Sequence, residues 1–296
     1  MGKPRLPSHK QNSVAILGTG LIGTSIGLAL RATKDRPTVV GWDPKRAALE
    51  AARASGGIQR GAKSMRAAIK GAKVIIIAAP LDGIEATLPD AVAAADPGSL
   101  VMDVGAVKSG VEKAAQRALR ARTDVRFVGG HPMAGRERSG AGHASAGLFA
   151  GCPFVLVAPR QRYRSKALAE AQALVRSIGG LPVSLSARAH DRLVAATSAL
   201  PQLASIALAC AVQASAGPGA RGIAGTGYRD ATRLALSPFT IWRPAIAANR
   251  AAVRRALRCL QTSLRRLISA VERGDDQALA REFSRAVHAR RRVVAD

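Results

Sequence analysis

The sequence predicts a doubly wound α/β domain with a mostly parallel sheet, followed by an all-α domain. Two observations predict this fold class. Short apolar runs alternate with helical stretches up to about residue 185, which is the pattern of parallel strands joined by crossover helices. After residue 186 no convincing strand follows, and helical stretches continue to the C-terminus. We therefore expect one domain over 13–185 and a second over 186–296.

Composition favours a soluble globular protein with small anionic partners. The 296 residues are enough for two medium-sized domains. The formal net charge of +26 favours nucleic acid, acidic lipid, or metabolites that carry phosphate or carboxylate. The basic residues are spread along the chain without interleaved aromatics. This distribution makes a nucleic-acid partner the weaker alternative.

Three further features bear on metals and location. The three cysteines are far apart and form no Cys-x-x-Cys pair, so neither a zinc site nor a disulfide framework is expected. Residues 1–12 are basic and lack the apolar core of a signal peptide, which predicts a disordered tail. The uncharged run 193–220 is long enough to cross a bilayer. Its polar residues and alanines favour a buried helix instead, so no membrane segment is expected. The cysteine usage fits a reducing cytoplasm.

The first expected strand, 13–17, leads into a glycine motif. Residues 18–23 read Gly-Thr-Gly-Leu-Ile-Gly, and the small and apolar stretch to residue 30 predicts a helix. In such a turn the first glycine makes the bend and the second admits a pyrophosphate. The third lets helix and strand pack closely, with the phosphate at the helix N-terminus. The context predicts a Rossmann-type dinucleotide site that includes Gly18, Gly20, Leu21, Ile22 and Gly23.

An acidic residue after the second expected strand, 38–42, bears on the choice of nucleotide. Asp43 stands 20 residues after the last glycine of the motif, near the position where a carboxylate bonds the ribose 2′-hydroxyl. NAD is therefore expected over NADP, although Lys45 and Arg46 lie close by and leave NADP open. Asp43 could also cap the helix that follows, ahead of Pro44.

Further strands and helices complete the predicted layout. Strands are expected at 74–80, 100–103, 127–128, 153–157 and 181–185. Pro80 ends the most hydrophobic strand, at the edge where open α/β sheets bind ligands, and Pro89 is expected to kink or restart the next helix. In the helical half we expect a helix over 187–214 interrupted near Pro201, a glycine-rich loop at 217–227, and helices over 230–236, 240–272 and 276–293.

A histidine between a glycine pair and a proline is the first candidate for acid–base chemistry. His131 follows Gly129 and Gly130 and precedes Pro132, so we expect it on an ordered loop. Histidine has the proton affinity that suits acid–base work near neutral pH. Most histidines are surface or structural residues, so this stretch alone does not decide the role of His131.

Four segments together resemble the prephenate/arogenate dehydrogenase family. They are residues 18–25, 103–108 (Asp-Val-Gly-Ala-Val-Lys), 131–137 (His-Pro-Met-Ala-Gly-Arg-Glu) with 148–149, and 228–235 (Tyr-Arg-Asp-Ala-Thr-Arg-Leu-Ala) followed by Trp242. The glycine motif is generic, whereas the histidine and arginine segments are specific in order and spacing. The resemblance implies a dinucleotide-binding domain and a helical domain that dimerises, which agrees with the layout read from the pattern.

The resemblance implies an enzyme of tyrosine biosynthesis that oxidatively decarboxylates a cyclohexadienyl acid with NAD(P). His131 matches the family's proton acceptor, and Arg233 matches its clamp for a substrate carboxylate. A helix-face arginine paired with Asp230 is the alternative for Arg233, and Asp230 could also orient the clamp. The remaining expected contacts with the substrate are Gln202, Trp242, which could equally be a core aromatic, and Glu137, which could also hold His131. The remaining expected contacts with the cofactor are Pro80, Asp103 and Lys108.

Two departures from the family pattern leave the substrate open. Ala106 stands where the family usually has a serine whose hydroxyl can support the catalytic histidine. Residues 198–202 read Ser-Ala-Leu-Pro-Gln where the family tends to have Ser-His-Leu-Pro-His, so Ala199 and Gln202 replace two histidines. Prephenate, arogenate and a 4-amino analogue such as 4-amino-4-deoxyprephenate remain candidates. A non-catalytic homologue that binds nucleic acid is the alternative from another class.

Overall fold

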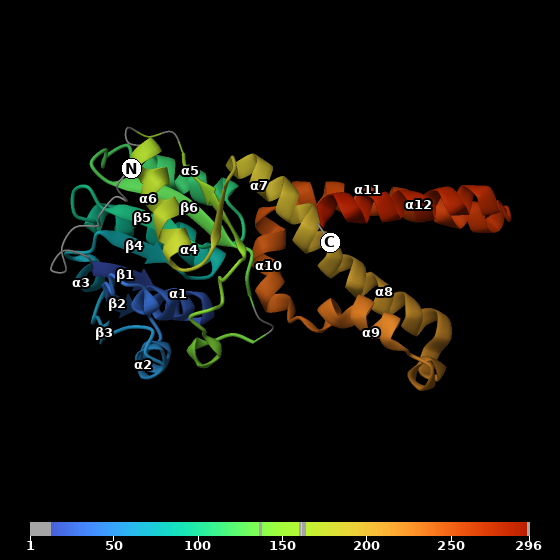
Figure 1. Ribbon diagram of the computed structural model, residues 1–296, viewed down its shortest axis with the longest axis horizontal. Helices are drawn as coiled ribbons and strands as arrows, with labels where there is room; N and C mark the ends of the chain where they lie inside the picture. Colours follow the sequence, from blue (N-terminus) through green and yellow to red (C-terminus); the bar gives the residue numbers. More distant parts are fainter. Residues whose placement is uncertain (1–12, 136–137, 160, 162–163, 295–296) are drawn as a thin grey trace. The chain divides into compact units, whose positions relative to one another are not determined.

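The computed structural model describes residues 13–135, 138–159, 161 and 164–294 (Figure 1). The chain separates into two compact units. The first, called the sheet unit here, comprises Met1–Val194 and Leu236–Ala248. The second, the helical unit, comprises Ala195–Ala235 and Asn249–Asp296. The predicted tail at 1–12 lies outside the described residues.

An eight-stranded sheet forms the centre of the sheet unit, in the order β3-β2-β1-β4-β5-β6-β7-β8. All neighbouring strands are parallel except β6 and β7, which confirms the predicted mostly parallel sheet. The chain order reverses between β1 and β4, and doubly wound sheets bind ligands at this switch point. The strands are β1 (Ser13–Leu17), β2 (Thr38–Trp42), β3 (Arg60–Gly61), β4 (Val74–Ile77), β5 (Leu100–Asp103), β6 (Arg126–Pro132), β7 (Pro153–Val157) and β8 (Leu181–Ser184).

Helices connect most of these strands and cover both faces of the sheet. The helices of the sheet unit are α1 (Leu21–Ala32), α2 (Arg46–Ala54), α3 (Met65–Ile69), α4 (Leu81–Ala94), α5 (Ser109–Ala118), α6 (Arg164–Ser177), α7 (Ala187–Val194) and α10 (Phe239–Ala248). Helix α4 runs through Pro89 as one helix. Pro89 is exposed, and its missing N–H removes one intrahelical hydrogen bond without ending the helix.

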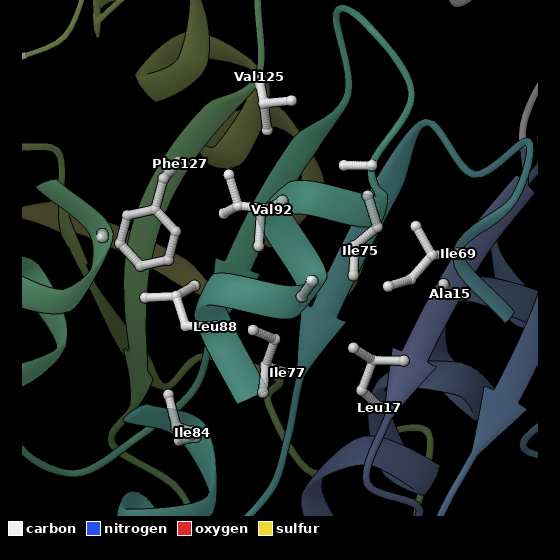
Figure 2. Close-up of a cluster of buried hydrophobic side chains, with 14 of the residues drawn as sticks. Ala15, Leu17, Ile69, Ile75, Ile77, Ile84, Leu88, Val92, Val125 and Phe127 are labelled. Carbon is white, nitrogen blue, oxygen red and sulfur yellow. The ribbon is translucent and has the colours of Figure 1, made fainter. Parts of the chain in front are cut away.

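Alternate strand residues enter two separate cores, because successive side chains of a strand point to opposite faces. Figure 2 shows the first core, in which Leu17, Ile75, Ile77 and Phe127 pack with residues of α3, α4 and α5. The second core contains Ile16, Ile76, Met102 and Val128 together with residues of α1, α2 and α6. The continuous apolar run of β4 follows from burial on both faces.

The chain after residue 194 differs from the sequence prediction in three local features. A π-helical stretch (Ala195–Ala199) precedes α8 (Leu200–Ala216) and accounts for the predicted interruption near Pro201. The expected single helix over 240–272 is two helices, α10 and α11 (Arg250–Glu272), because Asn249 leaves the helical conformation. The expected glycine-rich loop is largely helical, with a 3-10 helix over Gly217–Gly222 and α9 over Thr226–Thr232. A 3-10 turn (Arg233–Leu236) and α12 (Asp276–Val293) complete this part of the chain.

The apolar stretch that we expected to be a buried helix is mostly exposed in the single chain. The helical run Ala187–Gly222 is long and apolar enough to cross a membrane by length and composition alone, yet only 22% of its most apolar window is buried. Among the described residues of α8, Gln202 and Ser205 are the buried ones. A single helix of this kind is weak evidence for a membrane, since core helices of soluble proteins meet the same criterion. The expectation of a buried helix is therefore wrong for the single chain.

Candidate functional site

The three motif glycines of the turn between β1 and α1 have three different surroundings. Gly18 has a φ of +98°, and a Cβ there would lie 2.5 Å from the carbonyl oxygen of Ala78. A Cβ at Gly23 would lie 2.1 Å from the carbonyl oxygen of Gly18. A Cβ at Gly20 would meet no atom within 4 Å. The space beside Gly20, at the N-terminus of α1, can therefore admit a phosphate group, and the turn fits a dinucleotide.

The other residues predicted to contact the cofactor surround this turn or follow neighbouring strands. Leu21 and Ile22 are half-buried in the first turn of α1, and the exposed Pro80 is the N-cap of α4. Since parallel strands end at one edge of the sheet, β1, β2, β4, β5 and β6 present their connecting loops at the same edge.

Asp43 ties the end of β2 to the glycine turn. Its Oδ2 accepts hydrogen bonds from the backbone N–H of Thr19 at 2.8 Å and from the Thr19 hydroxyl at 3.3 Å. Its Oδ1 accepts from the backbone N–H of Lys45 at 2.9 Å. Helix α2 has Lys45 as its N-cap, so the alternative of Asp43 as N-cap is wrong. The carboxylate keeps lone pairs that a ribose hydroxyl can use.

A buried ion pair links β5 to β6. The Lys108 ammonium pairs with Asp103 and donates to the carbonyl oxygen of Gly130 at 2.7 Å. The side chains of Lys108 and Asp103 are 1% and 0% exposed. Burial lowers the pKa of Lys108, although the charge of Asp103 opposes this. The pair holds the strand that carries His131. The predicted contacts of Asp103 and Lys108 with a cofactor stay predictions.

His131 lies in strand β6, opposite Val155 of β7, so the expectation of a loop is wrong. The preceding glycines serve close packing within the sheet. A Cβ at Gly130 would lie 2.6 Å from the carbonyl oxygen of Asp103 and 2.9 Å from the ring of Phe154. The local turn signal therefore reflects crowding around a strand.

His190 and Asp191 of α7 belong to the site, although the sequence reasoning missed both. Nδ1 of His131 lies 2.9 Å from Nε2 of His190, and the two rings meet edge to face. Nδ1 of His190 lies 2.8 Å from Oδ1 of Asp191. Asp191 also accepts from the backbone N–H groups of Lys108 at 2.7 Å and Ser109 at 2.9 Å, at the start of α5. The one signal in the sequence is an adjacent His-Asp pair, which does not distinguish buried residues from exposed ones.

The surroundings of His131 favour its neutral form. Burial lowers the pKa of His131 well below 6.5, and the charges of Lys108 and His190 lower it further, against the opposing effect of Asp191. Burial also raises the pKa of Asp191, but hydrogen bonds from His190, Ser109 and backbone N–H groups outweigh this effect and lower it overall. At neutral pH the site therefore holds an uncharged imidazole, which can accept a proton, and a carboxylate.

The residues predicted to bind substrate are divided between the units. In the helical unit, Gln202 is buried in α8 and its Nε2 donates to the carbonyl oxygen of Leu234 at 2.8 Å. Its Oε1 has no partner among the described residues. Asp230 is exposed in α9, and Arg233 is exposed at the start of the following 3-10 turn. Trp242 is half-buried in α10 of the sheet unit, and Glu137 lies outside the described residues.

The fold and the glycine turn define a dinucleotide-binding protein, and comparison with known proteins identifies its family. The nucleotide-binding domain of prephenate dehydrogenase matches residues 26–183, and the dimerisation domain of prephenate dehydrogenase matches residues 186–285. The chain therefore belongs to the prephenate dehydrogenase family. This result confirms the resemblance read from the four segments and supports an NAD(P) cofactor.

Individual relatives agree with this family. Prephenate dehydrogenase from Bacillus subtilis is 30% identical over 246 residues, which cover 82% of this chain and 66% of the relative, just under two thirds of its length. Cyclohexadienyl dehydrogenase from Zymomonas mobilis is 29% identical over 96% of both chains. The structure of A. aeolicus prephenate dehydrogenase with hydroxyphenyl propionate and NAD+ matches with a TM-score of 0.86 at 23% identity, covering 96% of this chain and 98% of that one. Synechocystis arogenate dehydrogenase gives 0.83 at 24% identity, covering 95% and 100%. At these identities the structural matches show the shared fold.

Proposed function

We propose that the protein catalyses the NAD(P)-dependent oxidative decarboxylation of prephenate or arogenate, with His131 as the proton acceptor. The observation that carries this proposal is the neutral His131 at the carboxyl end of β6. Among the described residues its Nε2 has no hydrogen-bond partner, while its Nδ1 bonds His190. Membership of the prephenate dehydrogenase family supports the reaction class.

The reaction places a specific demand on His131. Bound NAD(P) would supply the acceptor for the hydride of the ring carbon that bears the hydroxyl. Nε2 of His131 takes the hydroxyl proton as the carbonyl forms. The ring then loses carbon dioxide, and the electron pair of the broken bond makes the ring aromatic. His131 returns its proton to the ring oxygen, so the protein ends the cycle in its starting protonation state.

Asp43 supports NAD as the preferred cofactor. Its carboxylate lies at the end of β2 beside the glycine turn, where it can accept from a ribose 2′-hydroxyl and would repel a 2′-phosphate. The exposed Lys45 and Arg46 are the residues through which NADP could bind. Initial rates with each cofactor at saturating substrate decide the preference.

Arg233 is proposed to clamp a substrate carboxylate, with Asp230, Trp242, Glu137 and Gln202 as further substrate contacts. The unpartnered Oε1 of Gln202 supports its part, since a donor group of a ligand would satisfy this buried acceptor. Arg233→Ala should raise KM for the substrate at least tenfold while KM for the cofactor stays within twofold. An unchanged KM for the substrate would indicate that Arg233 lies on a helix face without binding the substrate.

We also propose that the protein is a soluble, cytoplasmic homodimer. The match to the family's dimerisation domain and the exposed apolar side chains of α8 support this assembly. Ile206 and Leu208 are 39% and 40% exposed in the single chain, and a second copy would cover such side chains. Light scattering in solution should give twice the chain mass of 30.6 kDa.

The decisive experiment is an assay of reduced-cofactor formation with prephenate, arogenate and the 4-amino analogue, each with NAD and with NADP. His131→Asn should abolish turnover while NAD binding, followed by calorimetry, stays unchanged. Unchanged turnover in this variant would remove the role of His131. Absence of turnover in the wild-type protein with all three substrates would overturn the reaction.

A further inference from the structure

We propose that His190, backed by Asp191, is the positioning residue that fixes His131 in the tautomer whose Nε2 accepts the substrate proton. This inference rests on the proposed function, because it assigns a supporting residue to the same reaction. Neither residue is part of a sequence motif identified above. Both reach the site from α7, and His190 follows His131 by 59 residues.

The hydrogen bonds of Asp191 favour a single protonation state, the carboxylate. Both carboxylate oxygens accept from backbone N–H groups at the start of α5, Oδ1 from Lys108 and Oδ2 from Ser109. A protonated carboxyl would put a donor against one of these N–H groups or against His190. Asp191 is therefore a carboxylate that only accepts hydrogen bonds.

The state of Asp191 then determines the tautomers of both histidines. Nδ1 of His190 lies 2.8 Å from Oδ1 of Asp191, so Nδ1 must carry a hydrogen. In the proposed state His190 is neutral, and its other nitrogen is then an acceptor. Nε2 of His190 therefore accepts from Nδ1–H of His131 across 2.9 Å. The remaining nitrogen of His131, Nε2, is left with its lone pair available.

The residues before His131 in its own strand offer no side-chain hydrogen bond, since positions 129 and 130 are glycines. His190 is fully buried and Asp191 is 5% exposed, so the pair forms a rigid support. When His131 accepts a proton, its new positive charge lies near Lys108, and the Asp191 carboxylate offsets that repulsion.

The direct test is a 15N NMR spectrum of the imidazole nitrogens, since the chain holds five histidines. In the wild-type protein at pH 7 we expect protonated Nδ1 and unprotonated Nε2 for both His131 and His190. His131→Asn and His190→Gln each remove one set of signals and provide the assignments. A doubly protonated His190, or His131 protonated on Nε2, would overturn the inference.

Two substitutions at His190 separate positioning from general structure. In His190→Gln the amide oxygen can accept from His131 and the amide NH2 can donate to Asp191. The Nδ1–H tautomer of His131 should therefore be retained, and kcat should stay within about tenfold of the wild-type value. In His190→Leu the acceptor is lost. We expect His131 to populate both tautomers and kcat to fall by up to roughly 10,000-fold, the loss that a wrong histidine tautomer causes in a serine protease. KM for NAD should stay within twofold in both variants.

The failure of this inference and the failure of the proposed function give different results. Wild-type protein without turnover, with the expected NMR spectrum, would overturn the reaction and leave the hydrogen-bond chain standing. Turnover lost in His131→Asn but fully kept in His190→Leu would overturn the positioning role alone. If His190→Leu does not fold, the wild-type spectrum and His190→Gln still decide the matter.

Discussion

Gly20 and Gly23 provide matched substitutions that separate cofactor binding from packing. A methyl group at Gly20 would meet no atom of the chain within 4 Å, and the φ of −73° suits alanine. A methyl group at Gly23 would lie 2.1 Å from the carbonyl oxygen of Gly18, where real contacts stay beyond 3.0 Å. Because that neighbour is backbone, relief requires the strand and helix to move apart.

The two substitutions should affect different quantities: Gly20→Ala the stabilisation by NAD, and Gly23→Ala the free energy of unfolding. Gly20→Ala should change the free energy of unfolding by less than about 1 kcal/mol, whereas Gly23→Ala should lower it by about 1–3 kcal/mol or more. NAD at 100 times its Kd should stabilise the wild-type protein by about 2.7 kcal/mol, which raises Tm by roughly 5–11 °C. Gly20→Ala should abolish this rise, since its methyl group fills the space where the pyrophosphate approaches.

Thermal unfolding with and without NAD, together with calorimetric titration, measures both effects on the same samples. A Gly20→Ala protein that binds NAD with wild-type affinity would refute the placement of the pyrophosphate at this turn. A Gly23→Ala protein as stable as the wild type would refute the packing argument. Circular dichroism at 25 °C serves as the control for folding.

Three further predictions concern charge. Lys108→Met leaves Asp103 buried and unpaired, so urea unfolding should show a loss of about 3–5 kcal/mol, and adding Asp103→Asn should recover part of it. The low pKa of His131 should keep kcat/KM constant as pH falls from 7 to below 6.5, with a decline only in more acidic solution as the imidazole becomes protonated. Asp43→Ser removes the carboxylate that would repel a 2′-phosphate, and the ratio of kcat/KM for NADP to that for NAD should rise at least tenfold.

Each of these predictions has a contrary outcome. Equal stability of Lys108→Met and wild-type protein would show that the ion pair contributes little to the fold. An acid limb centred above 6.5 would show that His131 is more exposed to solvent or less affected by Lys108 than the structure indicates. An unchanged cofactor ratio in Asp43→Ser would assign nucleotide selection to other residues.

The sheet was predictable because its signals are local. The run from Val74 to Ile77 is apolar enough to require burial on both faces, and the glycine motif marks the turn from β1 to α1. The conformation around His131 was not predictable, since Gly129 and Gly130 indicate a turn when read alone. Their actual reason is contact with Asp103 and Phe154, which are neighbours only after the sheet has formed.

In the candidate site, too, residues marked by local motifs were predictable and residues brought in by folding were not. The turn glycines, Asp43 and His131 follow from motifs and spacing, but His190 reaches His131 only through the packing of α7 near the start of α5. Periodicity also failed for α8, because an apolar helix gives the same pattern whether its own chain or a second copy covers it. Composition therefore could not show that most of α8 is exposed in the single chain.

The path of the chain between its two units limits how this protein can be divided or recombined. The sheet unit is completed by α10, which returns after residue 235 and places Ala245 against the first core. A chain ended at residue 185 would lack α10, and it would also lack the histidine and carboxylate behind His131. A nucleotide-binding half exchanged between relatives would therefore need to carry both segments. Exchange at the apparent border would remove the packing of Ala245 on the first core and the contact between His190 and His131.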